Sequence, residues 1–277
     1  MSRTRIGDYP VTVQVREYGD GDVTLSMGQD VSDIATLRRS ARAWHDLQDP
    51  HADAALLGVT ILDLDRTITR RGTYSPFLIH AAIQCAPWRL LLVPVVLVCM
   101  IGYKLGLMER KALKQRMQML LMGRAVPRPT VERLAASFAD RVMRTNVHPA
   151  MLDLIARERA EGRILILATA AHRFYAAAIA RRLGIDRVVA TESVWRDGML
   201  LPDVQGDNCY GTNKAIALHR HLRATQLDRA AIMLRCYSDD ASDLPCFEAS
   251  DEAIAVNPSK KLARASRARG WPVIDLR

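Results

Sequence analysis

Short runs of aliphatic and β-branched residues recur along the chain from residue 57 to the end, and amphipathic stretches separate them. Such runs predict buried strands, and apolar residues at intervals of three and four predict helices. The strands expected are residues 59–62, 163–168, 188–190, 231–237, 253–256 and 273–274. A helix is expected around Met151, Leu152 and Ile155, and another over residues 173–183. Strands that alternate with helices are typical of an α/β fold with a Rossmann-like, doubly wound parallel sheet.

One long segment interrupts this alternation, because it contains helical patterns and no strand pattern. The domains expected are a core of residues 57–74 and 151–277, an inserted all-helical cap of residues 75–150, and a poorly ordered N-terminal extension of residues 1–56. The extension is polar and rich in Asp, Arg, Ser and Gly, a composition that buries little apolar surface. Within it, residues 11–15 suggest weak strand pairing and residues 33–47 suggest a helix.

The predicted cap contains fourteen consecutive uncharged residues, 90–103. A helix needs about 20 apolar residues to cross a bilayer, so a membrane span is the least favoured interpretation. Two others stay open: a helix buried in the cap against the apolar stripe of residues 113–122, or a segment that lies at a membrane interface. The run is flanked by basic residues that suit anionic lipid, namely Arg89, Lys104, Arg110, Lys111, Lys114, Arg116 and Arg124.

The composition limits the classes of function. A net charge of +9 favours acidic partners such as phosphates and anionic membrane surfaces. Aromatic residues make up only 5% and do not alternate with basic ones, so we expect no nucleic-acid partner. Five cysteines without a C-x-x-C pair argue against a disulfide framework and a structural zinc site. Since no signal peptide is visible, we expect a cytoplasmic protein, with peripheral contact at the inner face of the membrane as an alternative.

The candidate chemistry centres on Asp63 and Asp65, which directly follow the first predicted strand. Ligands of open α/β sheets bind at the carboxyl ends of the strands. Two carboxylates so close together repel each other, and a cation or a shared proton relieves this repulsion. An EF-hand loop that begins at Asp63 would need Gly and Glu where the chain has Ile68 and Tyr74, and residues 63–71 contain no glycine for a phosphate-binding loop.

Three further groups of polar residues follow predicted strands or begin predicted helices. Thr169 follows the second strand and precedes a helix, where a hydroxyl and backbone N–H groups can hold an anion. Lys214 begins a helix, where its charge opposes the helix dipole. Asp239, Asp240 and Asp243 follow the strand that ends near residue 237. Together these groups are the residue types that phosphoryl transfer assisted by a metal needs, although each of them alone is common at the ends of helices without any function.

The order of these motifs resembles the haloacid dehalogenase superfamily, in its phosphoserine-phosphatase-like branch, subfamily IB. Residues 63–67, Asp-Leu-Asp-Arg-Thr, are similar to the nucleophile motif D-x-D-x-T. Thr169 is similar to the Ser/Thr of the second motif, Lys214 to the lysine of the third, and residues 237–245 to the acidic fourth motif. The resemblance extends over roughly residues 57–277, and the predicted cap lies between the first and second motifs, at the position that the family gives to its cap.

The resemblance implies a role for each residue. Asp63 is the implied nucleophile that forms an aspartyl-phosphate, and Asp65 is the implied general acid and then base. Thr169 and Lys214 are implied to stabilise the charge of the phosphoryl group. Mg²⁺ is the implied cofactor, and its implied ligands are Asp63, the carbonyl of Asp65, and Asp239, with Asp243 behind them. The residues implied to contact substrate are Thr67, Arg71, Ala170, His172 and Arg173.

The implied activity is hydrolysis of a phosphomonoester of a small metabolite or a phospholipid headgroup. Phosphoserine phosphatases carry a glutamate shortly after the first motif, whereas residues 68–74 of this chain are basic. Phosphoserine phosphatase is therefore the alternative within enzymes. A non-catalytic, membrane-associated binding module is the alternative of another class, and the presence of Asp65 argues against it because a binding module needs no acid or base.

Overall fold

The computed structural model describes residues 14–17, 23–26 and 56–276. Strands β1 (Gln14–Glu17) and β2 (Val23–Ser26) pair antiparallel in a separate two-stranded sheet. The helix predicted over residues 33–47 lies outside the described residues, as does almost all of the extension predicted to be poorly ordered. These two predictions stay untested.

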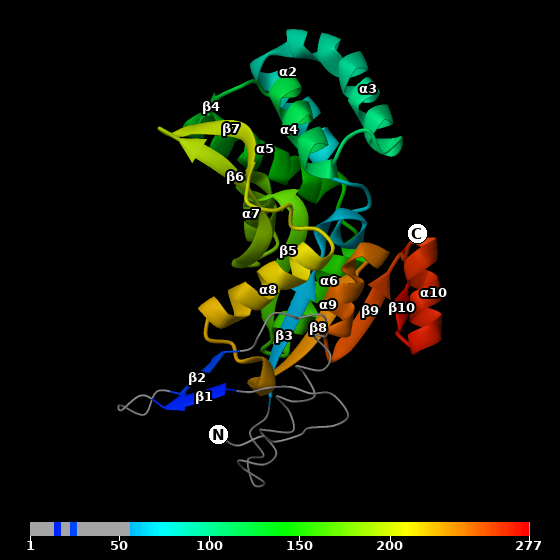
Figure 1. Cartoon of the computed structure of the whole chain (residues 1–277). Helices are drawn as coiled ribbons and strands as arrows, with labels where there is room; N and C mark the ends of the chain where they lie inside the picture. Colours follow the sequence, from blue (N-terminus) through cyan, green and yellow to red (C-terminus); the bar gives the residue numbers. More distant parts are fainter. Residues whose placement is uncertain (1–13, 18–22, 27–55, 277) are drawn as a thin grey trace.

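The core is an eight-stranded sheet with the order β10-β9-β8-β3-β5-β6-β7-β4 (Figure 1). Its strands are β3 (Leu57–Leu62), β4 (Val126–Pro127), β5 (Ile164–His172), β6 (Arg187–Arg196), β7 (Met199–Gln205), β8 (Ile232–Ser238), β9 (Glu252–Val256) and β10 (Val273–Ile274). Strand β3 lies between β5 and β8 and is parallel to both. The predicted parallel, Rossmann-like α/β sheet is confirmed, because all six predicted strands are present and mutually parallel.

Two layers of helices cover the sheet. The helices are α2 (Tyr74–Cys85), α3 (Val93–Lys104), α4 (Arg110–Leu121), α5 (Arg128–Thr145), α6 (Pro149–Ala160), α7 (Arg173–Arg182), α8 (Thr212–Ala224), α9 (Leu244–Glu248) and α10 (Lys260–Arg269). Side chains of successive strand residues point to opposite faces. In β5, Leu165 and Leu167 therefore join a core with α5, α6 and α7, while Ile166 and Ala168 join another core with α8, α9 and α10. The sheet is buried on both faces, as a parallel sheet requires.

Strands β6 and β7 form a long hairpin where the sequence predicted only a short strand over residues 188–190. Asp197 and Gly198 connect the strands with φ values of 49° and 74°. Two consecutive residues with positive φ are the hallmark of a tight hairpin turn, and Asp-Gly is a favoured pair for it. Strand β7 of the hairpin also pairs with β4. Residues 75–150, which we call the insertion, therefore contain one two-residue strand in addition to the predicted helices.

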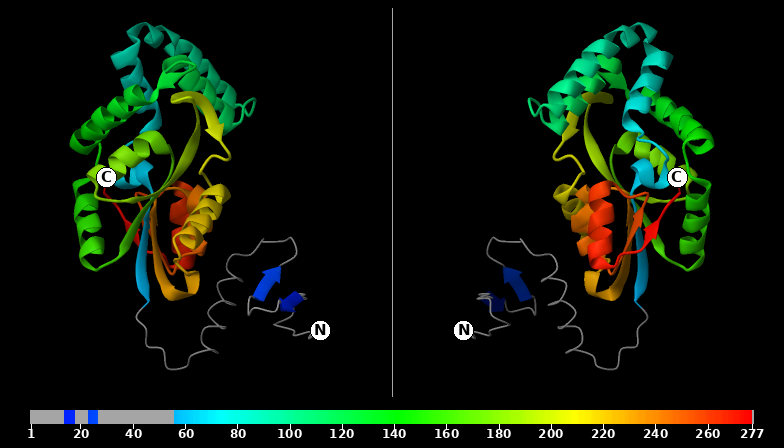
Figure 2. Two further views of the ribbon diagram at one scale, coloured as in Figure 1. Left: turned by 90° about the vertical axis from the view of Figure 1, so that its left-hand side faces the viewer. Right: turned by 90° about the vertical axis from the view of Figure 1, so that its right-hand side faces the viewer.

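The helices α2, α3 and α4 of the insertion lie beyond the carboxyl ends of the central strands (Figures 1 and 2). The predicted apolar run 90–103 forms a short turn and α3, and part of it packs as expected against α4, through Val93, Val96 and Met100. The rest is exposed: Leu91 is 80% exposed and Val98 67%. The interpretation of a helix buried in the cap is therefore wrong for one whole side of α3.

A buried carboxylate, Glu158 of α6, connects the three central strands. It accepts hydrogen bonds from Thr60 of β3 at 2.5 Å and from Tyr237 of β8 at 2.9 Å. It also forms ion pairs with Arg163, which precedes β5, at 3.1 Å, and with Arg235 of β8 at 2.6 Å. Burial raises the pKa of Glu158, but these donors outweigh it and lower the pKa overall. Glu158 thus fixes the strands relative to one another.

We expect Glu158→Ala to lower the free energy of unfolding by about 3–5 kcal/mol, the usual cost of removing one partner from a buried ion pair. Arg163 and Arg235 would lose their buried counterion. Urea unfolding followed by circular dichroism measures the effect. Glu161→Ala is the matched control, since Glu161 is 57% exposed and lies 3.6 Å from the same Arg235. Equal effects of the two substitutions would contradict the role of Glu158.

Candidate active site

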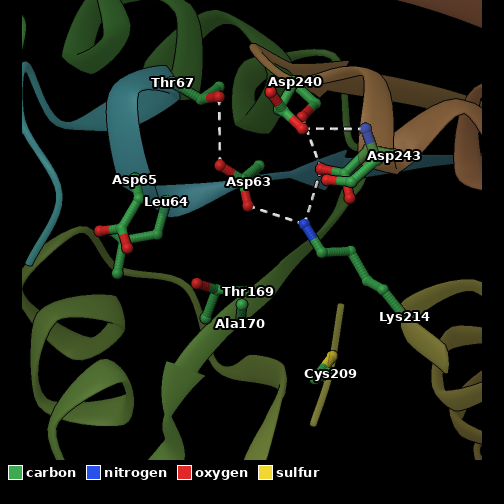
Figure 3. Close-up of polar contacts among 12 residues, drawn as sticks. Asp63, Leu64, Asp65, Thr67, Thr169, Ala170, Cys209, Lys214, Asp240 and Asp243 are labelled. Carbon is green, nitrogen blue, oxygen red and sulfur yellow. Dashed lines mark hydrogen bonds and ion pairs between the residues drawn. The ribbon is translucent and has the colours of Figure 1, made fainter. Parts of the chain in front are cut away.

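The predicted nucleophile Asp63 directly follows β3, at the carboxyl end of the sheet (Figure 3). Its backbone N–H donates to the carbonyl oxygen of Tyr237 at 3.0 Å, which continues the pairing with β8. Parallel strands end at the same edge, so the residues that follow β8 and those at the end of β5 lie beside Asp63. Asp63 is 7% exposed.

Lys214, near the start of α8, joins two carboxylates. Its Nζ atom donates to Oδ1 of Asp63 at 2.8 Å and to Oδ2 of Asp243 at 2.7 Å. The hydroxyl of Ser238 donates to the same oxygen of Asp243 at 2.6 Å, whereas Oδ1 of Asp243 is buried and has no hydrogen-bond partner among the described residues. Burial would lower the pKa of Lys214, but Asp63 and Asp243 raise it well above its ordinary value. The lysine is therefore a fixed positive charge.

Asp65 points away from Lys214 and is held by Thr73, a residue that the sequence interpretation did not identify (Figure 3). The backbone N–H and the hydroxyl of Thr73 both donate to Oδ1 of Asp65, at 2.8 Å and 2.7 Å. Burial raises the pKa of Asp65, although the hydrogen bonds from Thr73 oppose this. A carboxyl group with a raised pKa and a fixed orientation is suited to donate and accept a proton.

The site carries more negative charge than Lys214 can balance. Burial, followed by repulsion from Asp63 and Asp240, raises the pKa of Asp239 to about 8. Burial also raises the pKa of Asp63, and Lys214 only partly opposes it. Among the described residues, no three His, Cys, Asp or Glu side chains form a ready metal cluster. The carboxylates of Asp63 and Asp239 and the backbone carbonyl of Asp65 are the predicted oxygen donors, and donors of this kind suit Mg²⁺.

The other predicted site residues divide into two groups. Thr67 donates to Oδ2 of Asp63 at 3.2 Å, and Thr169 lies close to Asp63 and Asp65 with its hydroxyl accepting from the N–H of Ala171 at 3.1 Å (Figure 3). Four further residues were predicted to contact substrate. Ala170 follows Thr169, and its carbonyl oxygen accepts from Lys114. Arg71 is exposed, Arg173 is paired with Glu192, and His172 is fully buried with Nδ1 2.8 Å from the hydroxyl of Ser193.

A family model described as haloacid dehalogenase-like hydrolase matches residues 60–248. The chain belongs to this family. The match includes Asp63, Asp65, Thr169, Lys214 and the acidic motif of residues 237–245, together with the whole insertion. As a haloacid dehalogenase-like hydrolase, the chain has an α/β core of the family type, which its structural neighbours also support.

Several known proteins are similar to this hydrolase. A probable phosphatase of Mycobacterium tuberculosis is 36% identical over 125 residues, which cover 44% of this chain and 42% of that protein. Phosphoserine phosphatase SerB1 of the same species is 30% identical over 146 residues, 52% of this chain and 46% of that protein. The chain thus matches less than half the length of these curated relatives. A protein of unknown function from Bordetella pertussis superposes with a TM-score of 0.72 and 25% identity over 80% of this chain and 100% of its own.

The sequence pattern groups Lys114 of this hydrolase with the basic residues that flank the apolar run. In the structure its side chain is only 6% exposed and contacts the core beside the site, at the carbonyl oxygen of Ala170. The signal was present in the helical pattern: Lys114 and Gln118 are adjacent to Leu113, Met117 and Leu121, which form the buried face of α4. A charge next to an apolar stripe indicates a buried polar contact as well as a solvated edge.

We expect the metal-free protein to lose stability as the pH rises from about 4 to about 8. The pKa of Asp239 rises from its ordinary value of 3.8 to about 8 on folding, so the folded state binds this proton more tightly. The free energy of unfolding therefore falls over that interval. Asp239→Asn removes the titrating group, so its stability should depend less on pH and exceed that of the wild type more at pH 8 than at pH 5.

Urea unfolding in the presence of EDTA at several pH values measures this dependence. Asp153→Asn, a substitution of an exposed aspartate on α6, serves as the control and should keep the wild-type slope. If the stability of Asp239→Asn fell with pH as steeply as that of the wild type, ionisation of Asp239 would not be the cause of the fall.

Proposed function

We propose that this chain is a Mg²⁺-dependent phosphomonoester hydrolase that acts through an aspartyl-phosphate on Asp63. The observation that carries the proposal is the pairing of two different carboxyl groups at one strand end. Asp63 accepts a hydrogen bond from Lys214 at 2.8 Å, whereas Asp65 points away from that lysine, has a raised pKa and is fixed by Thr73 (Figure 3). A nucleophile and a proton donor are the two groups that this reaction needs.

In the first step, an oxygen of Asp63 attacks the phosphorus atom and the bond to the ester oxygen breaks. Asp65 donates its proton to the departing oxygen, so the leaving group departs as an alcohol. In the second step, Asp65 takes a proton from water, the water oxygen attacks phosphorus, and Asp63 is released with inorganic phosphate. Thr169 and the ammonium of Lys214 lie beside Asp63, where negative charge develops.

We propose that Asp63, Asp239 and the carbonyl of Asp65 hold Mg²⁺. The raised pKa of Asp239 supports this, because burial and then repulsion from Asp63 and Asp240 disfavour its negative charge, and a bound cation would relieve both effects. When bound, the ion neutralises the carboxylates and the phosphoryl oxygens that approach them. Asp243 fixes Lys214 in this arrangement through their ion pair at 2.7 Å. The insertion covers this edge of the sheet, and we propose that it acts as the cap of the site.

We expect Asp63→Asn to abolish hydrolysis of an aryl phosphate and of an alkyl phosphate, because the amide is not a nucleophile. Asp65→Asn should lower the rate by ~10²–10⁴-fold on the alkyl ester and by less on the aryl ester, whose leaving group needs less protonation. Steady-state phosphate release by purified variants measures both effects, and EDTA followed by Mg²⁺ is the control for the metal.

Full activity of Asp63→Asn would refute the nucleophile, and equal losses of Asp65→Asn on the two esters would refute the acid. An inactive wild type with every ester would favour the non-catalytic binding module. Phosphoserine belongs among the esters tested, because a similar protein is named a phosphoserine phosphatase. The basic stretch 68–74 after the first motif argues for a different leaving group.

We propose further that the protein contacts an anionic membrane surface through α3, with a phospholipid headgroup as one class of substrate. Residues 87–104 form an 18-residue helical stretch with a mean hydropathy of 1.5, of which only 6% is buried. By length and composition alone this stretch meets the criterion for a membrane span. Exposed apolar patches of this kind mark contacts with membranes or proteins. Exposed Lys104 ends this stretch, and exposed Arg116 lies on the next helix, α4.

We expect the wild type to float with vesicles that contain phosphatidylserine and to dissociate partly at high salt. Val98 and Ile101, 67% and 56% exposed, are the residues to change. The double variant Val98→Asp and Ile101→Asp should lose most of the binding, because the two carboxylates oppose insertion and are repelled by the anionic lipid. A flotation gradient measures the bound fraction.

The matched control is the double variant Ile216→Asp and Val273→Asp, since these apolar residues are also exposed, at 41% and 50%, but lie on α8 and β10 of the core. It should float like the wild type. A wild type that stays in the soluble fraction at low salt, or a control that binds as weakly as the α3 variant, would contradict the membrane surface.

A further inference from the structure

Lys114 is a buried lysine with no carboxylate partner among the residues that the structure describes. Its Nζ atom donates to the carbonyl oxygen of Ala170 and to Oδ1 of Asn208, at 2.5 Å each. Both acceptors are neutral, and among the described residues no carboxylate lies within ion-pair distance of this ammonium group. The ammonium group also lies 5.5 Å from the centre of the Tyr74 ring, which is a neutral partner as well, and it has three donors for its two oxygen acceptors. Lys114 therefore differs from Lys214, which contacts two carboxylates.

The charge of Lys114 is costly for the folded protein. Burial, followed by repulsion from Arg110, lowers the pKa of Lys114 to about 7. The oxygens of Ala170 and Asn208 also have another hydrogen-bond donor besides Lys114. The hydroxyl of Thr191 lies 2.9 Å and 3.0 Å from them and can donate to one of the two. Buried lysines are rare unless they are paired. A buried ionisable side chain whose charge destabilises the folded protein is typical of a functional site.

The surroundings of Lys114 indicate what its partner would be. It comes from α4 of the insertion and reaches Ala170, the residue next to Thr169 of the active site (Figure 3). Its charge is close enough to act on Asp65, the proposed proton donor to the leaving group. Arg110, one turn earlier on α4, stacks over the ring of Tyr210 at 3.9 Å, so two cations share the face of the helix that meets the core.

We propose that Lys114 determines specificity by binding a negatively charged group on the leaving group of the substrate, with Arg110 as a second positive charge nearby. The inference rests on the proposed phosphatase function and names the substrate class within it. The transferred phosphate is already served by Lys214 and Thr169 on the core side of the site. A carboxylate or a second phosphate on the leaving group would supply the counterion that Lys114 lacks.

The test compares kcat/KM of the wild type, Lys114→Met and Lys111→Met on matched esters. O-phosphoserine against O-phosphoethanolamine isolates a carboxylate, and propane-1,3-diol bisphosphate against propyl phosphate isolates a second phosphate. The wild type should prefer the anionic ester in one of the two pairs. Lys114→Met should reduce that preference ~10–100-fold, the range of a charged hydrogen bond. Lys111→Met, whose lysine bonds to the carbonyl of Gly206 at the surface, should retain it.

An aryl phosphate separates failure of this inference from failure of the proposed function. If the wild type hydrolyses the aryl phosphate but prefers neither anionic ester, the role of Lys114 is refuted alone. A loss in Lys114→Met that is equal for all esters would mean that the lysine serves the transferred phosphate, and would also refute it. A wild type that hydrolyses no ester, the aryl phosphate included, would refute the phosphatase and this inference together.

Binding gives a second readout that needs no turnover and no folded Lys114→Met. Asp63→Asn retains Lys114 but lacks the nucleophile, so calorimetry can measure the Kd of each ester pair in the presence of Mg²⁺. The preferred ester should bind ~10-fold or more tightly than its counterpart that lacks the additional anionic group. Equal affinities within both pairs would refute the proposal.

Discussion

The active site depends on one buried ion triad, Lys214 between Asp63 and Asp243. Buried charges are costly unless they are paired, and here one ammonium group contacts both carboxylates within 2.8 Å. The triad ties α8 and the segment after β8 to the end of β3. Asp239 lies outside this triad, and burial and repulsion from Asp63 raise its pKa although Arg66 partly opposes them. A cation at this edge would complete the balance that the lysine begins.

Two other charge systems of the molecule show the contrast between a structural and a functional arrangement. Glu158 has two arginines and two hydroxyl donors for its two oxygens, so its charge is fully used and fixes the central strands. Among the described residues Lys114 has only neutral partners, namely two oxygen acceptors and the ring of Tyr74. Both are buried, but only the first gains its stabilisation from the folded chain alone. The second would gain it from a ligand, which is why burial alone does not separate structural charges from functional ones.

The sequence predicted those features that depend on local pattern. The strand before Asp63, the helix that begins near Lys214 and the acidic segment at Asp239 all follow from short runs of residues, and the structure brings their ends together. The hairpin of β6 and β7 was missed although Asp197-Gly198 is a turn signal, because its strands alternate weakly and one of them lies near the edge of the sheet. The inward direction of Lys114 depends on how α4 packs, which no charge count reveals.

The insertion has two faces with opposite chemistry, and this has a consequence for substrates. On α4, Lys114 and Arg110 meet the core beside the carboxylates of the proposed site, whereas on α3 the side chains of Val98 and Ile101 are exposed. A soluble metabolite needs only the first face. An amphiphile with an anionic group next to its phosphate would use both, since its headgroup could reach α4 while its apolar part stays in a membrane that contacts α3. The two faces are independent physical features, so membrane contact and recognition of an anionic leaving group can each hold without the other.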